Sequence, residues 1–145
     1  MNIQRRRLMQ ALLALGVSGP VFNQIVQAAQ QGIITKPIPS SGEQLPVIGV
    51  GSSRTFDALG DAELMSRLQQ VMQAFFDHHG ALIDSSPMYG SAEAVIGKLL
   101  ANASSKDRMF AATKVWIDGE QEGIEQMERS RQLWGVKRFD LMQIH

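Results

Sequence analysis

The sequence predicts an α/β protein with a parallel sheet. Short apolar runs alternate with segments whose apolar residues recur at helical spacing, in the order β-α-β-α-β-α-β. The predicted strands are continuously apolar, which is typical of parallel strands buried on both faces. Two architectures share this order, an open doubly wound sheet and a (β/α)8 barrel. A nucleotide-binding start to an open sheet is disfavoured, because Gly49-Val50-Gly51 continues as Ser-Ser-Arg and does not complete G-x-G-x-x-G.

Residues 1–30 are predicted to be an export signal and are set apart from the fold. Arg5 and Arg6 precede a modest apolar run, and Val26 and Ala28 occupy positions −3 and −1 of a cleavage site. The arginine pair resembles the twin-arginine pattern, so we expect the twin-arginine export machinery as a partner and the periplasm as the location. A Sec signal, an uncleaved membrane tether and a mitochondrial presequence are the alternatives. The apolar run is too short and broken for stable membrane insertion.

The following residues, 31–145, are predicted to form one domain, and each element has its own sequence signal. Prolines and a Ser-Ser-Gly-Glu turn indicate an exposed hairpin before the first buried strand. Asp61 is a suitable N-cap for the first helix, and Gly80 is a suitable stop. The expected elements are a strand at 46–50, a helix over 61–79 with Leu64, Leu68, Val71, Met72, Phe75 and Phe76 on its apolar face, a strand at "ALID", a helix over 91–103 with Val95, Ile96, Leu99 and Leu100, a strand at "MFAATKVW", a helix over 120–134 with Ile124, Met127 and Leu133, and a strand at "FDLMQIH".

The composition excludes several classes of function. The chain has no cysteine, so disulfides, thiolate metal sites and cysteine nucleophiles are absent. Residues 1–42 contain four of the 14 basic residues and no acid, which leaves ten basic and 14 acidic residues beyond them. This acidic remainder lacks the basic face that nucleic-acid binding requires. The three histidines lack metal-binding spacing, and we expect no metal site.

Polar side chains with chemical uses follow three successive predicted strands. Asp84 ends the second strand, Tyr89 lies in the loop after it, Lys114 ends the third strand, and His145 ends the fourth. Because parallel strands end at one edge of a sheet, we expect these four groups to lie together, where barrel enzymes have their active sites.

The four groups together have the composition of a proton-donating site. A lysine ammonium ~4 Å from a phenol would favour the phenolate by up to ~4 kcal/mol at an effective dielectric of about 20. Tyr89 would then be a proton donor, Asp84 would hold Lys114, and His145 would orient a substrate oxygen. The alternative is a structural Asp84–Lys114 ion pair beside a packed tyrosine and an incidental histidine.

With these residues in this order, the sequence resembles the aldo-keto reductases from about residue 33 onward. The resemblance is carried by "LPVIGVGSS", "IDSSPMYGSAEAVIGKLL", "ATKVW" and "FDLMQIH". It implies a (β/α)8 TIM barrel that reduces a small aldehyde or ketone with NADPH, or with NADH as the alternative. It also implies that Tyr89 is the general acid, tuned by Lys114 and Asp84, and that His145 positions the carbonyl group.

The same resemblance implies a cofactor-binding role for Ser52, Ser53, Arg54 and Asp84. Ser52-Ser53 departs from the family, which often has Thr followed by Trp or another large residue there. One wall of the substrate pocket is therefore expected to be reduced.

The length of the chain sets a further expectation. Barrels of this kind take ~250 residues, whereas about 115 follow the predicted signal. We expect this chain to supply about the first four β/α units of the barrel, as the N-terminal half of a longer protein. A non-catalytic nucleotide-binding or regulatory barrel and an inactive truncated fragment are the alternative functions.

Overall fold

The protein contains a parallel sheet of four strands that lie in chain order. The computed structural model describes residues 33–103 and 108–145. Within these residues, β3 (Val50–Gly51), β4 (Leu82–Asp84), β5 (Phe110–Val115) and β6 (Leu141–Ile144) pair as β3-β4-β5-β6. All three pairings are parallel, so the four carboxyl ends lie at one edge of the sheet. The predicted parallel sheet, with helices between successive strands, is confirmed.

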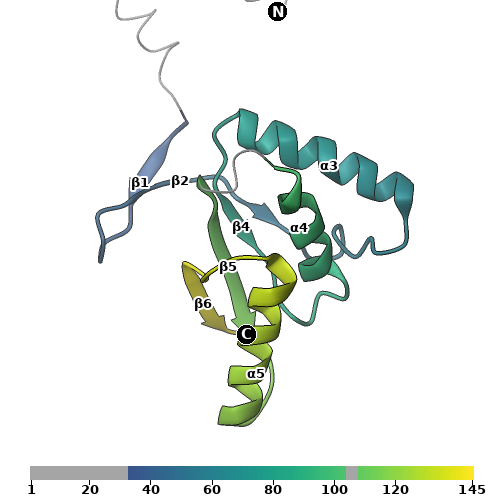
Figure 1. Cartoon of the computed structure of the whole chain (residues 1–145). Coiled ribbons are helices and arrows are strands. Elements are labelled where there is room, and N and C mark those ends of the chain that lie inside the picture. The colour runs from purple at the N-terminus through teal and green to yellow at the C-terminus, as the bar shows by residue number, and fades with distance from the viewer. Residues whose placement is uncertain (1–32, 104–107) are drawn as a thin grey trace, which may run out of the picture. The chain divides into compact units, whose positions relative to one another are not determined.

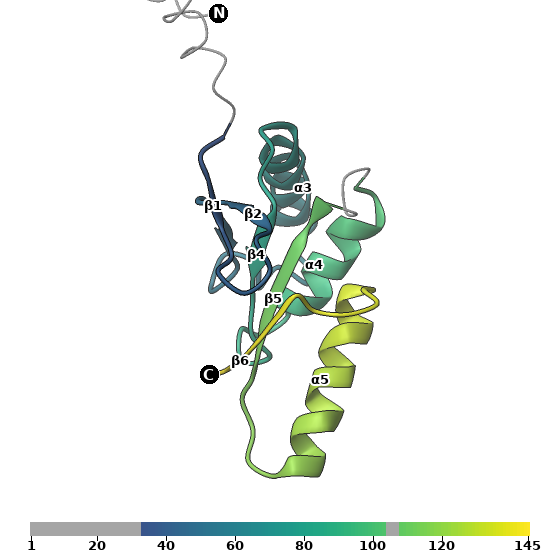
Figure 2. The same ribbon diagram turned by 90° about the vertical axis from the view of Figure 1, so that its left-hand side faces the viewer.

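Three helices connect the strands and lie on one side of the sheet (Figures 1 and 2). They are α3 (Ala62–Asp77), α4 (Ala92–Ala101) and α5 (Glu120–Trp134). Each joins two neighbouring parallel strands, which is the crossover connection that such strands need. The hydrophobic core lies between the helices and the sheet, and its fully buried members include Met72, Ile83, Val95, Ile96 and Trp134.

Helix α3 begins and ends close to its predicted limits. The Asp61 side chain accepts a hydrogen bond from the backbone N–H of Leu64 at 2.9 Å, as expected of an N-cap. At the other end His79, with a φ of 63°, adopts the left-handed conformation that terminates many helices. Gly80 has a different role there, because a Cβ atom on it would lie 2.2 Å from the Phe75 ring. The apolar face is as predicted except for Val71, which is exposed.

Helices α4 and α5 pack closely against each other. A Cβ atom at Gly97 would lie 1.8 Å from the carbonyl oxygen of Leu133, so only glycine permits this approach. The predicted apolar face of α4 is confirmed, since Val95, Ile96, Leu99 and Leu100 are all buried.

The predicted face of α5 is wrong. Of the three predicted residues, Ile124 and Leu133 are exposed and Met127 is half-buried, whereas the buried residues are Gly123, Ser130 and Trp134. Two members of this stripe, Gly123 and Ser130, have small side chains, and Ser130 and Trp134 donate hydrogen bonds to a buried carboxylate. A search for apolar residues at helical spacing overlooks such a stripe.

The prediction of one strand at 46–50 is also wrong, because this segment divides between two sheets. An antiparallel hairpin of β1 (Thr35–Pro37) and β2 (Gln44–Pro46) comes first, with its turn where the sequence indicates one. Because residues up to Pro46 pair with β1, the chain joins the parallel sheet only at Val50. Val47 and Ile48 are exposed between the two sheets.

The described elements belong to the unit Thr35–His145. The predicted export signal, residues 1–30, lies outside the described residues. None of the helices in the described part of the chain is both long and apolar enough to cross a membrane.

Candidate active site

Asp84 and Lys114 form an ion pair at the carboxyl edge of the sheet. The Lys114 Nζ atom lies 2.8 Å from Asp84 Oδ1, 2.7 Å from Asp84 Oδ2 and 2.8 Å from the carbonyl oxygen of Ser85. The Lys114 side chain is 13% exposed and the Asp84 side chain 33% exposed, so the pair is largely shielded from water. Three oxygen acceptors satisfy the three donors of the ammonium group and fix its position.

The register of the strands explains why these two residues meet. Asp84 is opposite Ala112 in the β4–β5 pairing, and Lys114 follows two residues later on the same face of β5. The side chain of Lys114 therefore projects from the carboxyl end of β5 beside the end of β4. The expectation that Asp84 and Lys114 come together is confirmed.

Tyr89 lies in the loop between β4 and α4, with its ring beside the ion pair. Lys114 Nζ is 5.4 Å from the centre of the Tyr89 ring. The backbone N–H of Tyr89 donates to the carbonyl oxygen of Ser86 at 3.0 Å, and Ser86 is buried. A turn that is fixed in this way holds the Tyr89 ring beside the Lys114 ammonium group.

His145 comes directly after β6 and places its imidazole next to the tyrosine ring. The two ring centres are 6.0 Å apart, and the rings meet edge to face at 80°. The backbone N–H of His145 donates to Val115 at 3.0 Å, which continues the β5–β6 ladder. The structure thus brings all four predicted residues to one edge of the sheet.

Gln143 is a member of this cluster that the sequence analysis missed. Its Nε2 atom lies 3.3 Å from Asp84 Oδ1, and it is opposite Lys114 in the β5–β6 register. The signal was present, because Gln143 is two residues before His145 and so lies on the same face of the strand.

Three of the four residues expected to bind the cofactor, Ser52, Ser53 and Arg54, follow β3 at the same edge. The Ser52 backbone N–H donates to the carbonyl oxygen of Asp84 at 3.0 Å, and the Ser52 hydroxyl group donates to Ser85 at 2.8 Å. Ser52 is fully buried, whereas Ser53 and Arg54 are exposed. Arg54 has a φ of 65°, in the left-handed region that non-glycine residues seldom adopt.

Asp57 connects this loop to the loop that carries Tyr89. Asp57 Oδ1 accepts hydrogen bonds from the backbone N–H of Ser91 at 2.8 Å and from the Ser91 hydroxyl group at 2.7 Å. These hydrogen bonds, that from the backbone most strongly, hold the pKa of Asp57 below its ordinary value of 3.8. The sequence analysis did not find this contact, since 34 residues separate its partners.

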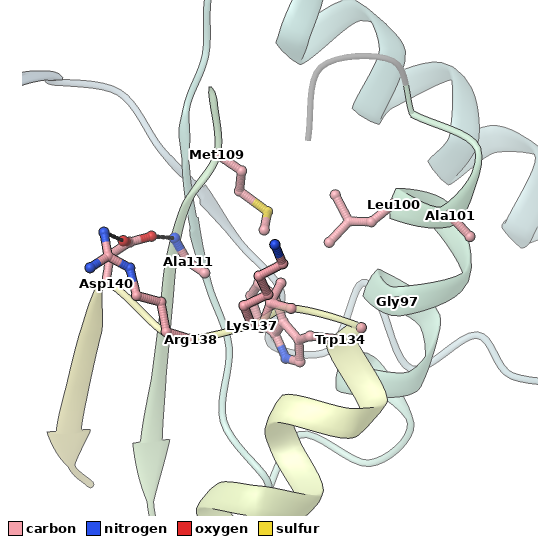
Figure 3. A pocket seen from close by; sticks show the side chains of 11 residues that line it. Gly97, Leu100, Ala101, Met109, Ala111, Trp134, Lys137, Arg138 and Asp140 are labelled. Carbon is pink, nitrogen blue, oxygen red and sulfur yellow. Dashed lines mark hydrogen bonds and ion pairs between the residues drawn. The ribbon is translucent and has the colours of Figure 1, made fainter. Parts of the chain in front are cut away.

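A cavity of about 490 Å³ lies elsewhere, near the amino ends of β5 and β6 (Figure 3). It is lined by residues of α4, of the C-terminal end of α5 and of the segment that leads into β6, Trp134 and Lys137 among them. Asp140 in its wall accepts from the backbone N–H of Ala111 at 2.9 Å and pairs with Arg138 at 3.5 Å. The cavity is therefore remote from the ion pair at the carboxyl edge.

Metal chemistry has no obvious site in this part of the chain. No group of three or more histidine, aspartate or glutamate side chains that could hold a metal ion is found among residues 33–103 and 108–145.

Comparison with known proteins gives consistent matches over this region. The model of the Aldo/keto reductase family matches residues 47–145. A 9,11-endoperoxide prostaglandin H2 reductase from Trypanosoma cruzi is 27% identical over 104 residues, which are 70% of this chain and 34% of that protein.

Solved structures of aldo-keto reductases show the same fold. One from Klebsiella pneumoniae, in complex with NADP and acetate, superposes with a TM-score of 0.64 at 22% identity over 77% of this chain and 40% of its own. One from Brucella melitensis gives a TM-score of 0.62 at 22% identity over 78% of this chain and 41% of its own. The chain thus spans less than half the length of the relatives it matches. The described sheet and helices correspond to the N-terminal part of their barrel fold.

Proposed function

The chain belongs to the aldo/keto reductase family, and we propose that it is the N-terminal half of a (β/α)8 barrel that reduces an aldehyde or ketone to an alcohol. The observation that carries this proposal is the meeting of an ammonium group, a phenol and an imidazole at one edge of the sheet, with separations of 5.4 and 6.0 Å. These three groups can bind and protonate a carbonyl oxygen. A hydride donor must supply the other half of the reduction, and we propose NADPH, with NADH as the alternative.

The donor groups at the β3 end suit a phosphate-bearing cofactor. Ser53 offers a hydroxyl group and Arg54 a guanidinium group, and both residues are exposed. They directly follow Ser52, whose backbone N–H donates to the carbonyl oxygen of Asp84. Ser52 would support this loop through its buried hydrogen bond to Ser85. Asp84 is one-third exposed, so it can accept a hydrogen bond from a ribose hydroxyl group while it holds Lys114. The bound cofactor supplies the hydride, and the NADP complex of the Klebsiella pneumoniae relative supports this choice.

Tyr89 is proposed as the group that gives its proton to the carbonyl oxygen. A free phenol holds its proton too tightly to release it readily at neutral pH. The Lys114 ammonium group, whose Nζ atom lies 5.4 Å from the ring centre, is proposed to assist this transfer through its positive charge. Asp84 keeps this cation in place, and Gln143 helps to hold Asp84.

His145 is proposed to position the substrate. Its imidazole lies next to the tyrosine ring, so a ring N–H can donate to the same carbonyl oxygen that Tyr89 protonates. Two donors directed at one oxygen fix the carbonyl group and stabilise the negative charge that develops on it. The substrate class is therefore a small molecule with an aldehyde or ketone group.

The test is to measure NADPH binding by fluorescence and turnover on a panel of aldehydes and ketones. It requires this chain together with the rest of the barrel. Saturable binding and NADPH oxidation that depends on the carbonyl compound are expected. Binding without turnover would contradict the proposed reaction and indicate a regulatory barrel. The absence of both would indicate an inactive protein.

We further propose that residues 1–30 direct export to the periplasm by the twin-arginine route. The support is the sequence pattern at Arg5 and Arg6 followed by a weakly apolar run. Replacing both arginines with lysine in a reporter fusion should abolish its appearance in the periplasm. Undiminished export would indicate the Sec route.

A further inference from the structure

Glu93 is a buried carboxylate that the proposed reaction does not use. It lies in the first turn of α4 and is only 4% exposed. Its Oε1 atom accepts hydrogen bonds from the Thr113 hydroxyl group at 2.8 Å and from Trp134 Nε1 at 3.2 Å, and its Oε2 atom accepts from the Ser130 hydroxyl group at 2.8 Å. One carboxylate therefore joins α4 to β5 and α5.

Such an arrangement is costly unless all the hydrogen bonds are made. Moving a carboxylate out of water is strongly unfavourable, and an apolar side chain of similar volume often packs as well or better. None of the four ion pairs found among the described residues includes Glu93. Three neutral donors stabilise the group, so its geometry depends on where the elements that supply them lie.

The position of Thr113 connects this network to the candidate active site. Thr113 directly precedes Lys114 on β5, and successive strand residues point to opposite faces. The Thr113 side chain is directed to the helices and bonds to Glu93, while that of Lys114 bonds to Asp84. Glu93 also follows Tyr89 by four residues, across the turn that begins α4.

We propose that Glu93 is a positioning residue, which fixes β5 at Thr113 and so sets Lys114 at the correct place relative to Tyr89. This inference rests on the proposed function of that pair. The hydrogen bonds of the carboxylate go to Thr113, Ser130 and Trp134, so it acts through the backbone of β5 on one side and the first turn of α4 on the other. Small displacements matter here, because a misplacement of about 1 Å in an active site can cost about 100-fold in rate.

Two buried hydroxyl groups allow a matched test in the whole barrel. Thr113 and Ser130 donate to the two oxygens of the same carboxylate at the same distance, 2.8 Å. Thr113 precedes Lys114, whereas Ser130 lies on α5, which supplies none of the proposed site residues. Thr113→Val should lower kcat at least about tenfold with KM within about threefold, and Ser130→Ala should leave kcat within about threefold of the wild type. Both substitutions should lower the melting temperature.

Two conservative variants complete the design. Thr113→Ser keeps the hydroxyl group and should retain wild-type kcat. Glu93→Gln keeps Oε1 for Thr113 and Trp134, while the Ser130 hydroxyl group can turn to accept from the new amide. The kcat of Glu93→Gln should therefore also stay within about threefold of the wild-type value. Equal losses of kcat in Thr113→Val and Ser130→Ala would overturn the proposal, because they would indicate a purely structural role.

A second readout separates this inference from the proposed reaction. The ring of Tyr89 can be labelled with carbon-13, and its NMR signal is assigned by its disappearance in Tyr89→Phe. Thr113→Val should shift this signal more than Ser130→Ala does, whether or not the protein reduces carbonyl compounds. Equal shifts would overturn the positioning role even in an active enzyme. Unequal shifts in an inactive protein would support the positioning role and contradict only the proposed carbonyl reduction.

Discussion

Lys114 is bound by three oxygen atoms, two from Asp84 and one from the backbone of Ser85. Its position is therefore set before any substrate arrives, and its charge is available to the Tyr89 ring 5.4 Å away. If this charge assists proton release, removing it should slow the reaction without preventing folding.

The first prediction concerns the two partners in this ion pair. Lys114→Met should lower kcat/KM for carbonyl reduction at least about tenfold at neutral pH, because the phenolate loses its stabilising cation. Asp84→Asn should give a smaller loss, since Lys114 keeps its charge and two acceptor oxygens. Steady-state kinetics at several pH values measures both effects. Lys98→Met, at an exposed lysine of α4, is the control and should match the wild type. Wild-type rates in Lys114→Met would contradict the role given to its charge.

The second prediction uses the lowered pKa of Asp57. Because the folded state holds this pKa below 3.8, ionised Asp57 stabilises the fold above about that pH. The contribution is lost as the pH falls through the lower, folded-state value. The difference in unfolding free energy between the wild type and Asp57→Asn should therefore be largest near neutral pH and shrink below about pH 4. Urea unfolding between pH 3 and 7 measures it. A difference that stays constant over this range would show that the carboxylate charge is not involved.

At the residue scale, the sequence predicted the groups that end strands and missed those that depend on tertiary contacts. Asp84, Lys114 and His145 could be found because strand ends are visible as breaks in apolar runs. The buried position of Glu93 could not be found, because a glutamate in the first turn of a helix is ordinarily exposed and is favoured there by the helix dipole. Its burial depends on donors 20, 37 and 41 residues away.

At the element scale, the contact between α4 and α5 places the strictest requirement on side-chain size. The backbone of α5 approaches Gly97 so closely that a methyl group there would overlap the Leu133 carbonyl oxygen. This approach also brings Ser130 and Trp134 to Glu93. Helix limits were predictable from caps and periodicity, and α5 has the limits expected. The buried face of α5 could not be predicted, because two of its three buried residues are glycine and serine.

The third prediction follows from this close approach. Gly97→Ala should lower the free energy of unfolding by about 1–3 kcal/mol, because overpacking outweighs the gain in helix propensity. Gly51→Ala is the control: a Cβ atom there meets nothing within 4 Å, so a change within about 0.5 kcal/mol is expected. Chemical denaturation of both variants gives the comparison. A Gly97→Ala protein as stable as the wild type would mean that the two helices can separate at little cost.

At the scale of the whole molecule, the described sheet has two outer strands, β3 and β6, that each pair with one neighbour. Leu141 and Ile144 of β6 are exposed, Ile144 at 94%. Three helices lie on one side of the sheet, and Figure 2 shows no described helix on the other. Parallel sheets are ordinarily covered on both faces, and unpaired strand edges promote association. The barrel was predictable in outline because its β/α units repeat locally, whereas closure depends on strands beyond the fourth.

The fourth prediction is that residues 31–145 alone behave as an incomplete fold. They should unfold over a broad temperature range and bind a hydrophobic dye, while a protein extended by about 150 residues to a full barrel should melt cooperatively. Calorimetry and dye fluorescence on both proteins measure this. A sharp, cooperative transition in the monomeric shorter chain would contradict it.

The central claim is that Tyr89 donates the proton in a carbonyl reduction, and Tyr89→Phe in the whole barrel tests it most directly. The substitution removes one hydroxyl group and leaves the ring that packs beside His145. Carbonyl reduction should fall at least about 100-fold, because general acid catalysis commonly contributes 10²–10⁴. NADPH affinity should stay within about threefold, since the phenol is proposed to contact the substrate oxygen and not the cofactor. A reduction rate within about threefold of the wild type would contradict the role proposed for Tyr89.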